Sequence, residues 1–155
     1  MARQALWATV ALLLAACGGG VAMAPRTNDL AAKRFEQPQA GLAALYIVRE
    51  GTFMSTPIAV LVDQRRIGNL AYGTYFRVEL TPGWHDVRVR DLDTGQQLAV
   101  TNIQLGPGDL RFVSINNAVF DGIGMRTVTE MSTREVPGDQ GRSAVAGKKL
   151  AAAAF

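Results

Sequence analysis

The chain has 155 residues, a formal charge of +3 from 16 Lys or Arg and 13 Asp or Glu, one cysteine and one histidine. A single cysteine excludes an internal disulfide and a metal site built from several cysteines. Basic residues scattered along the chain predict no nucleic-acid partner, and the length predicts one folded domain.

The first patterned segment is apolar and ends at the cysteine. Residues 6–16, LWATVALLLAA, form an uninterrupted hydrophobic run that follows Arg3. A membrane-spanning helix needs about 20 apolar residues, so this run is too short to cross a bilayer. A short apolar run behind a positive start is typical of a secretory signal peptide, which we predict at residues 1–16.

The end of this run resembles the lipobox of bacterial lipoproteins, through Leu14, Ala15, Ala16 and Cys17. The resemblance implies that a diacylglycerol is added to the Cys17 thiol and that cleavage leaves Cys17 as an acylated N-terminus. It also implies a membrane partner through these acyl chains. Gly18, where inner-membrane lipoproteins of enterobacteria carry Asp, implies the outer membrane, facing the periplasm. The alternative is a cysteine that happens to end an ordinary signal peptide.

The segments on either side of the expected domain lack a clear period. Residues 17–41 are rich in Gly, Ala, Pro and charged residues, which predicts a flexible linker, with one or two helical turns allowed within residues 29–37. Residues 135–155 contain a helix-favouring stretch interrupted by Gly147. A helix this short is marginal in water without packing, so we predict a frayed or disordered C-terminal tail.

The middle of the chain has the period of two that is typical of β-strands. Turn signals recur every 8–12 residues, which favours an antiparallel β-sandwich or barrel. Of these two all-β folds we expect the sandwich, of prealbumin or immunoglobulin type, over residues 42–134. We predict eight short strands, at residues 43–50, 57–63, 66–70, 73–80, 84–92, 97–105, 110–116 and 124–131.

A motif within these strands resembles a bacterial family with no established activity, Domain of Unknown Function 2846. The resemblance covers about residues 42–130, and its Pro-Gly-x-His turn is also similar to that of PEGA-type envelope modules. The chain departs from the pattern at Gln64, where the family usually has Gly. The matching residues are Asp63, Arg65, Arg66, Ile67, Gly68, Leu70, Gly73, Tyr75, Phe76, Leu80, Pro82, Gly83 and His85.

The residue types that carry catalysis or bind metals are sparse. His85 is the only histidine, so we interpret it as a structural residue near a turn, hydrogen-bonded to backbone, rather than as a base or ligand. Asp91 and Asp93 lie in a DLDTG turn without the later Glu of a calcium loop. Two basic pairs, at residues 65–66 and 148–149, are compatible with anionic lipid or cell-wall material. We predict no catalytic residue, no cofactor and no metal.

A contact surface is predicted from alternation. Tyr75 and Arg77 alternate away from the expected core on one strand, and Trp84 and Arg88 do so on the next. Aromatic and Arg side chains together are typical interface anchors, although the same pattern fits a second buried face. We expect a lipid-anchored, non-catalytic sandwich that binds or braces an envelope protein or cell-wall glycan. The alternative is a ligand-binding or enzymatic accessory protein with its site in the loops.

Overall fold

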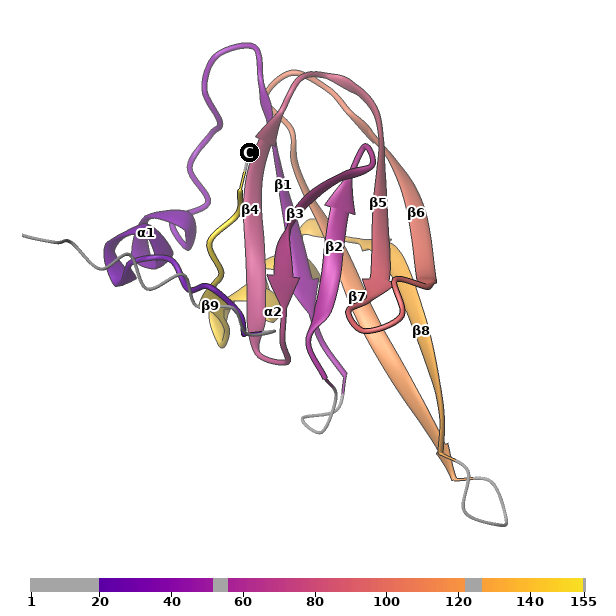
Figure 1. Cartoon of the computed structure of the whole chain (residues 1–155). Helices are drawn as coiled ribbons and strands as arrows, with labels where there is room; N and C mark the ends of the chain where they lie inside the picture. Colours follow the sequence, from indigo (N-terminus) through magenta and orange to yellow (C-terminus); the bar gives the residue numbers. More distant parts are fainter. Residues whose placement is uncertain (1–19, 52–55, 122–126, 155) are drawn as a thin grey trace, which may run out of the picture.

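A computed structural model describes residues 20–51, 56–121 and 127–154, and in it the chain forms a two-layer β-sandwich with helices on one side (Figure 1). The predicted all-β sandwich is confirmed. The described residues form nine strands and two helices: α1 (Arg26–Ala32), β1 (Ala43–Arg49), β2 (Ile58–Val62), β3 (Arg65–Leu70), β4 (Thr74–Leu80), β5 (Gly83–Asp91), β6 (Gln97–Leu105), β7 (Leu110–Asp121), β8 (Thr127–Val136), α2 (Gly138–Ala146) and β9 (Lys149–Leu150).

The strands divide into two sheets. Sheet 1 has the order β8-β7-β1-β4-β9, and sheet 2 has the order β3-β2-β5-β6. The prediction of a purely antiparallel sandwich is wrong in two places, because β1 pairs with β7 and β4 pairs with β9 in parallel. Both parallel pairs join strands that are far apart in the sequence, as parallel pairing requires a long connection.

The main core lies between the two sheets and follows the predicted alternation. Phe76 and Val78 of β4 and Val87 and Val89 of β5 are all buried in it. Strand β1 is different, because every one of its residues is buried. It lies at the centre of sheet 1 and is covered on both faces, which explains its nearly continuous apolar sequence, AALYIVR.

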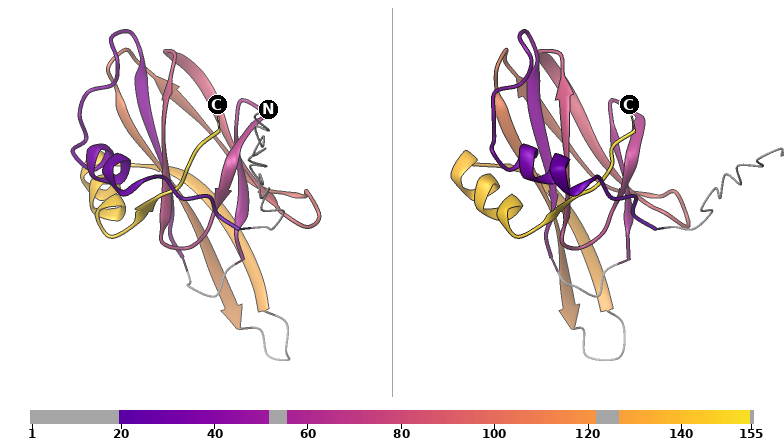
Figure 2. Two further views of the ribbon diagram at one scale, coloured as in Figure 1. Left: turned by 60° about the vertical axis from the view of Figure 1, so that its left-hand side comes forward. Right: turned by 90° about the vertical axis from the view of Figure 1, so that its left-hand side faces the viewer.

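A second core covers the outer face of sheet 1. Three fully buried rings form its centre, and the centroid of the Tyr46 ring lies 5.0 Å from that of Phe112 and 6.3 Å from that of Tyr75. Ala32 of α1 and Val145 of α2 close this layer. Both helices therefore lie on the side of the sandwich opposite sheet 2 (Figure 2).

The predicted disordered tail at residues 135–155 is wrong. These residues complete β8, form α2 and add β9 to the edge of sheet 1. Intrinsic helix propensity is low in α2, but tertiary packing compensates for it. A Cβ at Gly141 would overlap the Phe112 ring, so this glycine lets the helix lie directly on the sheet.

The predicted flexible linker is also wrong for the described residues that follow Gly20. Residues 26–32 form α1, and the chain before it pairs with the C-terminal segment through a bridge between Met23 and Ala151. The Tyr46 hydroxyl donates to the Ala32 carbonyl at 2.8 Å, which attaches α1 to sheet 1. Burial of one helical face thus stabilises a segment whose composition alone resembles a linker.

The turn between β2 and β3 keeps the tight geometry of a two-residue hairpin despite the departure at Gln64. Asp63 and Gln64 both have positive φ, 49° and 66°. Two left-handed residues in succession are characteristic of a type I′ turn, in which Gly is preferred at the second position. The side chain of Asp63 is thereby fixed beside β5, where it contributes to the site described below.

The connection between β4 and β5 does not form the predicted hairpin. Strand β4 pairs with β1 and β9 in sheet 1, whereas β5 pairs with β2 and β6 in sheet 2. Thr81 and Pro82 therefore carry the chain from one sheet to the other. Gly83 starts β5 with a φ of 141°, in the region that favours glycine.

Candidate functional site

The crossover between the sheets separates the four residues predicted to form one contact surface. Tyr75 is fully buried beneath α1, and Arg77 is half-buried on the same face of sheet 1. Trp84 and Arg88 instead lie on the outer face of sheet 2. The prediction of a single surface is therefore wrong: the second-buried-face alternative holds for Tyr75, while Trp84 is 70% exposed.

Arg77 has a structural role in the helix-covered layer. Its Nε donates to the Tyr46 hydroxyl at 3.1 Å, and its Nη2 donates to Glu79 Oε1 at 2.8 Å. Burial by itself disfavours the charge, but the bonds to Glu79 and Tyr46 outweigh this effect and raise the pKa of Arg77. These contacts leave Arg77 as a brace for the second core.

The two predicted residues on sheet 2, Trp84 and Arg88, belong to a continuous surface on β5 and β6, which we call the β5–β6 face. Residues on the two strands pair directly, with Trp84 opposite Gln104, Asp86 opposite Asn102 and Arg88 opposite Val100. Trp84 and Val100 are the apolar members and are 70% and 46% exposed. A shallow depression of about 330 Å³ beside Trp84 is lined by Asp63, Trp84, His85, Asp86 and Asn102.

The Arg88 side chain forms an ion pair with Asp86, which lies two residues earlier on the same strand. Its Nε donates to Asp86 Oδ1 at 2.8 Å and its Nη2 donates to Asp86 Oδ2 at 3.1 Å. This bidentate geometry is the preferred one between guanidinium and carboxylate, and the hydrogen bond that Arg88 donates to Asp86 raises the pKa of Arg88. The charged groups beside Trp84 are thus ordered before any partner binds.

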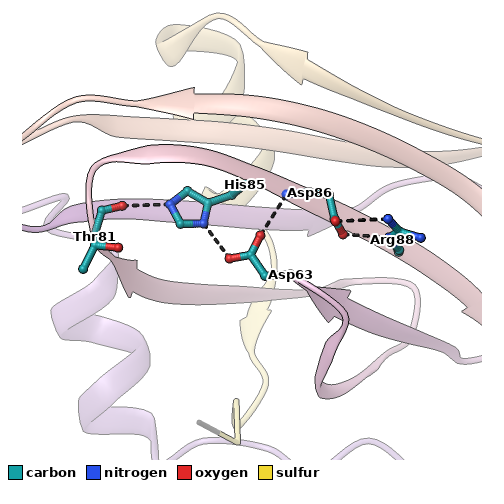
Figure 3. A network of polar contacts seen from close by, with 5 residues as sticks. All are labelled: Asp63, Thr81, His85, Asp86 and Arg88. Carbon is teal, nitrogen blue, oxygen red and sulfur yellow. Dashed lines mark hydrogen bonds and ion pairs between the residues drawn. The ribbon is translucent and has the colours of Figure 1, made fainter.

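His85 follows Trp84 on β5, and its ring is held by two acceptors (Figure 3). Its Nδ1 lies 2.7 Å from Asp63 Oδ2, and its Nε2 lies 2.8 Å from the Thr81 carbonyl oxygen. Asp63 Oδ1 in turn accepts a hydrogen bond from the Asp86 backbone N–H at 3.0 Å. The predicted contact of His85 with backbone near the turn is present.

This geometry favours the charged form of the histidine. Burial alone lowers its pKa, but the bonds to Asp63 and Thr81 together with the Asp63 charge raise the pKa of His85 above its ordinary value. Only the doubly protonated ring can donate to both acceptors. With both nitrogens occupied, the ring has none left to accept a substrate proton, so the Asp63–His85 pair fastens the β2–β3 turn to the β4–β5 crossover.

We predict that His85→Gln lowers the free energy of unfolding by about 0.5–3 kcal/mol and removes a pH dependence. Because the folded pKa is raised, the contribution of His85 is fully present below its unfolded pKa of about 6.5 and is lost as pH rises through the folded value. Urea denaturation should therefore show the wild type to be more stable at pH 5.5 than at pH 9, with a smaller difference in the variant. Equal pH dependence in both proteins would contradict this role.

The predicted turn at Asp91 and Asp93 is closed by the side chain of Asp91. Asp91 Oδ1 accepts hydrogen bonds from the backbone N–H groups of Asp93 and Thr94, at 3.0 and 2.8 Å. The bonds from Thr94 and Asp93 lower the pKa of Asp91. Its carboxylate therefore caps the β5–β6 hairpin, as such Asx turns commonly do.

Sequence reasoning missed two polar residues that the fold uses. Asp63 was identified from the sequence only as one position of the motif. The presence of Asp63 and His85 in the same motif was a signal that could have predicted their contact. Arg49 was not noted at all, yet it continues the inward series of Ala43, Leu45 and Ile47. Its Nη2 donates to the Thr56 carbonyl at 3.2 Å, and burial lowers its pKa to about 10. Among the described residues, its Nε and Nη1 have no hydrogen-bond partner.

The lipobox residues Leu14, Ala15, Ala16 and Cys17 lie outside the described residues. Among residues 20–51, 56–121 and 127–154, no helix has the length and apolar character needed to cross a bilayer, and no group of three or more His, Cys, Asp or Glu is placed to hold a metal. No protein-family model matches the chain, and no curated protein matches it. The resemblance to Domain of Unknown Function 2846 therefore stays a prediction.

Proposed function

We propose that the protein is a lipid-anchored, non-catalytic module of the bacterial envelope, and that its β5–β6 face binds an envelope protein or a cell-wall glycan. The observation that carries this proposal is the Trp84 side chain, which is 70% exposed on a paired strand. Large exposed rings are costly to leave in water and are enriched at contact sites.

The surroundings of Trp84 support a contact role. Arg88 and Asp86 are ordered by their own ion pair, and Asn102 and Gln104 on β6 supply amide groups beside the ring. A surface whose side chains are already fixed loses less conformational entropy when a partner binds. Its shape, a shallow depression rather than an enclosed cavity, fits a macromolecular surface better than a small ligand.

The cysteine at position 17 supports the anchored part of the proposal. A thiolate is the nucleophile that thioether formation requires, and Cys17 is the chain's only cysteine. Several acyl chains would hold the mature protein at a membrane almost irreversibly. The sandwich would then be presented to the periplasm, with the β5–β6 face on the side opposite the helices (Figure 2).

We predict that Trp84→Ala removes the partner without unfolding the protein. The side chain makes few buried contacts, so the free energy of unfolding should change by about 0.5 kcal/mol or less. Chemical cross-linking in native membranes, followed by purification and mass spectrometry, should recover a partner with wild type and not with the variant.

Leu30→Ala provides the matched control, because Leu30 is a 54% exposed apolar residue on α1. It should recover the partner as well as wild type does. If Trp84→Ala also recovers it fully, the proposed contact surface is wrong.

A further inference from the structure

A strongly basic pocket lies at the opposite side of the molecule from the β5–β6 face. It has a volume of about 630 Å³, and its lining includes Arg26 of α1, Lys33, Lys148 and Lys149, with Asp29 as its carboxylate. Positions 33, 148 and 149 are the chain's three lysines. The lining thus carries four cationic side chains and one carboxylate, and an anion would meet these cations.

The single carboxylate is already occupied by the fold. Asp29 accepts hydrogen bonds from the Lys33 ammonium at 2.8 Å, from the Tyr75 hydroxyl at 2.9 Å and from the Leu150 backbone N–H at 2.9 Å. Burial by itself would raise its pKa, but these bonds hold the pKa of Asp29 below its ordinary value. Asp29 is therefore charged and fully engaged, and it does not neutralise the remaining cations.

The other three cations have no polar partner among the described residues. Within the part of the chain that the structure describes, the side chains of Arg26, Lys148 and Lys149 make no hydrogen bond or ion pair. Lys148 and Lys149 are fixed in place by their backbone, since the Lys149 N–H donates to the Gly73 carbonyl at 3.0 Å and Lys33 donates to the Lys148 carbonyl at 2.5 Å. The fold thus fixes the backbone from which these two lysine side chains extend.

Two exposed apolar side chains flank these cations. Met23, which is paired with Ala151 just after β9, is 45% exposed, and Tyr72, next to the Gly73 that Lys149 contacts, is 44% exposed. Tyr and basic residues are the usual pair at a membrane–water interface, where the ring and the cation meet the headgroups. Two other exposed apolar side chains, Trp84 and Val100, lie away from the pocket on the β5–β6 face.

The path of the chain brings this surface near the proposed anchor. Met23 is six residues after Cys17, and six residues span at most about 20 Å when fully extended. If Cys17 carries acyl chains, the pocket cannot lie far from the headgroups to which those chains lead.

We propose that the surface formed by Met23, Arg26, Tyr72, Lys148 and Lys149 rests on the anionic headgroups of the lipid bilayer, with phosphate groups entering the basic pocket. This inference rests on the proposed anchor at Cys17. It assigns the anchored domain an orientation, in which the helix side faces the membrane and the β5–β6 face points into the periplasm.

The experiment uses amine labelling, because every lysine of the chain lines this pocket. The full acylated protein is reconstituted into vesicles of phosphatidylcholine alone, or of phosphatidylcholine with phosphatidylglycerol, and labelled with a water-soluble acylating reagent. Mass spectrometry should show Lys148 and Lys149 reacting about fivefold more slowly in the anionic vesicles. About 0.5 M NaCl should restore the faster rate, since salt screens such contacts. Equal rates in the two vesicles would overturn the proposal.

Two charge reversals separate a local contact from general attraction. Arg26→Glu should abolish the protection, whereas Arg66→Glu, which makes the same change in charge at an exposed residue of sheet 2, should keep it. Equal loss in both would overturn the orientation. If the protein fails to stay in neutral vesicles, the anchor is wrong; the basic surface is then judged by co-sedimentation with anionic vesicles, which Arg26→Glu must reduce and Arg66→Glu must not.

Discussion

Replacing Tyr75 by alanine is expected to lower the free energy of unfolding by about 3–5 kcal/mol, the range for an emptied aromatic core position. The ring is fully buried between sheet 1 and α1, and its centroid lies 6.3 Å from that of the Tyr46 ring. Its hydroxyl also donates to Asp29 Oδ1 at 2.9 Å, so the variant removes both packing and a connection to α1. Urea denaturation monitored by circular dichroism measures the loss.

Two control variants test whether the loss of stability is specific to the buried Tyr75 ring. Tyr75→Phe should cost only the hydrogen bond, about 0.5–1.5 kcal/mol, because the ring remains. Trp84→Ala, at the exposed aromatic of sheet 2, should change stability by about 0.5 kcal/mol or less. Similar losses for Tyr75→Ala and Trp84→Ala would mean that the two strands do not place these rings on opposite sides of the sandwich.

Cys17→Ser should abolish lipidation of the protein completely. A serine hydroxyl is a far weaker nucleophile than a thiolate, so no thioether forms and the signal segment is not processed at this position. Each acyl methylene buried in a bilayer contributes about 0.8 kcal/mol, so losing the chains removes the whole anchor. Wild-type protein from cells grown with labelled palmitate should carry label, and the variant should carry none.

Gly18→Ala is the control for this substitution, since it alters the neighbouring residue and keeps the thiol. It should incorporate label as wild type does. Absence of label from the wild type, together with retention of Cys17→Ser in the carbonate-washed membrane pellet, would show that the lipobox resemblance is misleading.

Local periodicity predicted strands that correspond to β1–β8, and the buried faces of β4 and β5, because alternation is a short-range property. It missed the two-residue β9, and the predicted residues 124–126 lie outside the described residues. Phe76, Val78, Val87 and Val89 all lie in the core where the pattern puts them. Which strands pair is a long-range property, and it was predicted wrongly at Pro82. The same Pro-Gly chemistry allows a hairpin or a crossover between sheets, and only the competing partners of β4 and β5 decide between them.

The helices were underestimated for a related reason. The helix-favouring stretch that Gly147 interrupts is short, and the observed α2 begins before it, at Gly138, and includes Gly141, a second residue of low helix propensity. What stabilises α2 is its contact with Phe112, through the space that Gly141 leaves. This contact lies on the outer face of sheet 1, which the sequence pattern alone does not distinguish from a solvated or partner-binding face.

The candidate site was predicted in part. The place of Trp84 on the same face of β5 as Arg88 follows from alternation along a single strand. The burial of Tyr75, the pairing of His85 with Asp63 and the gathering of the lysines into one pocket depend on tertiary structure. They join segments more than 20 residues apart, and a single sequence carries little information about such contacts.

Site-specific photo-cross-linking in living cells tests the central claim most directly. A photoreactive residue at Val100, on the β5–β6 face, is compared with one at Gln140, an exposed position on α2. The proposed function predicts a discrete adduct from position 100 that disappears when Trp84→Ala is added, and none of that size from position 140. An adduct of the same size from position 140 alone, or one from position 100 that persists in the Trp84→Ala background, would contradict it.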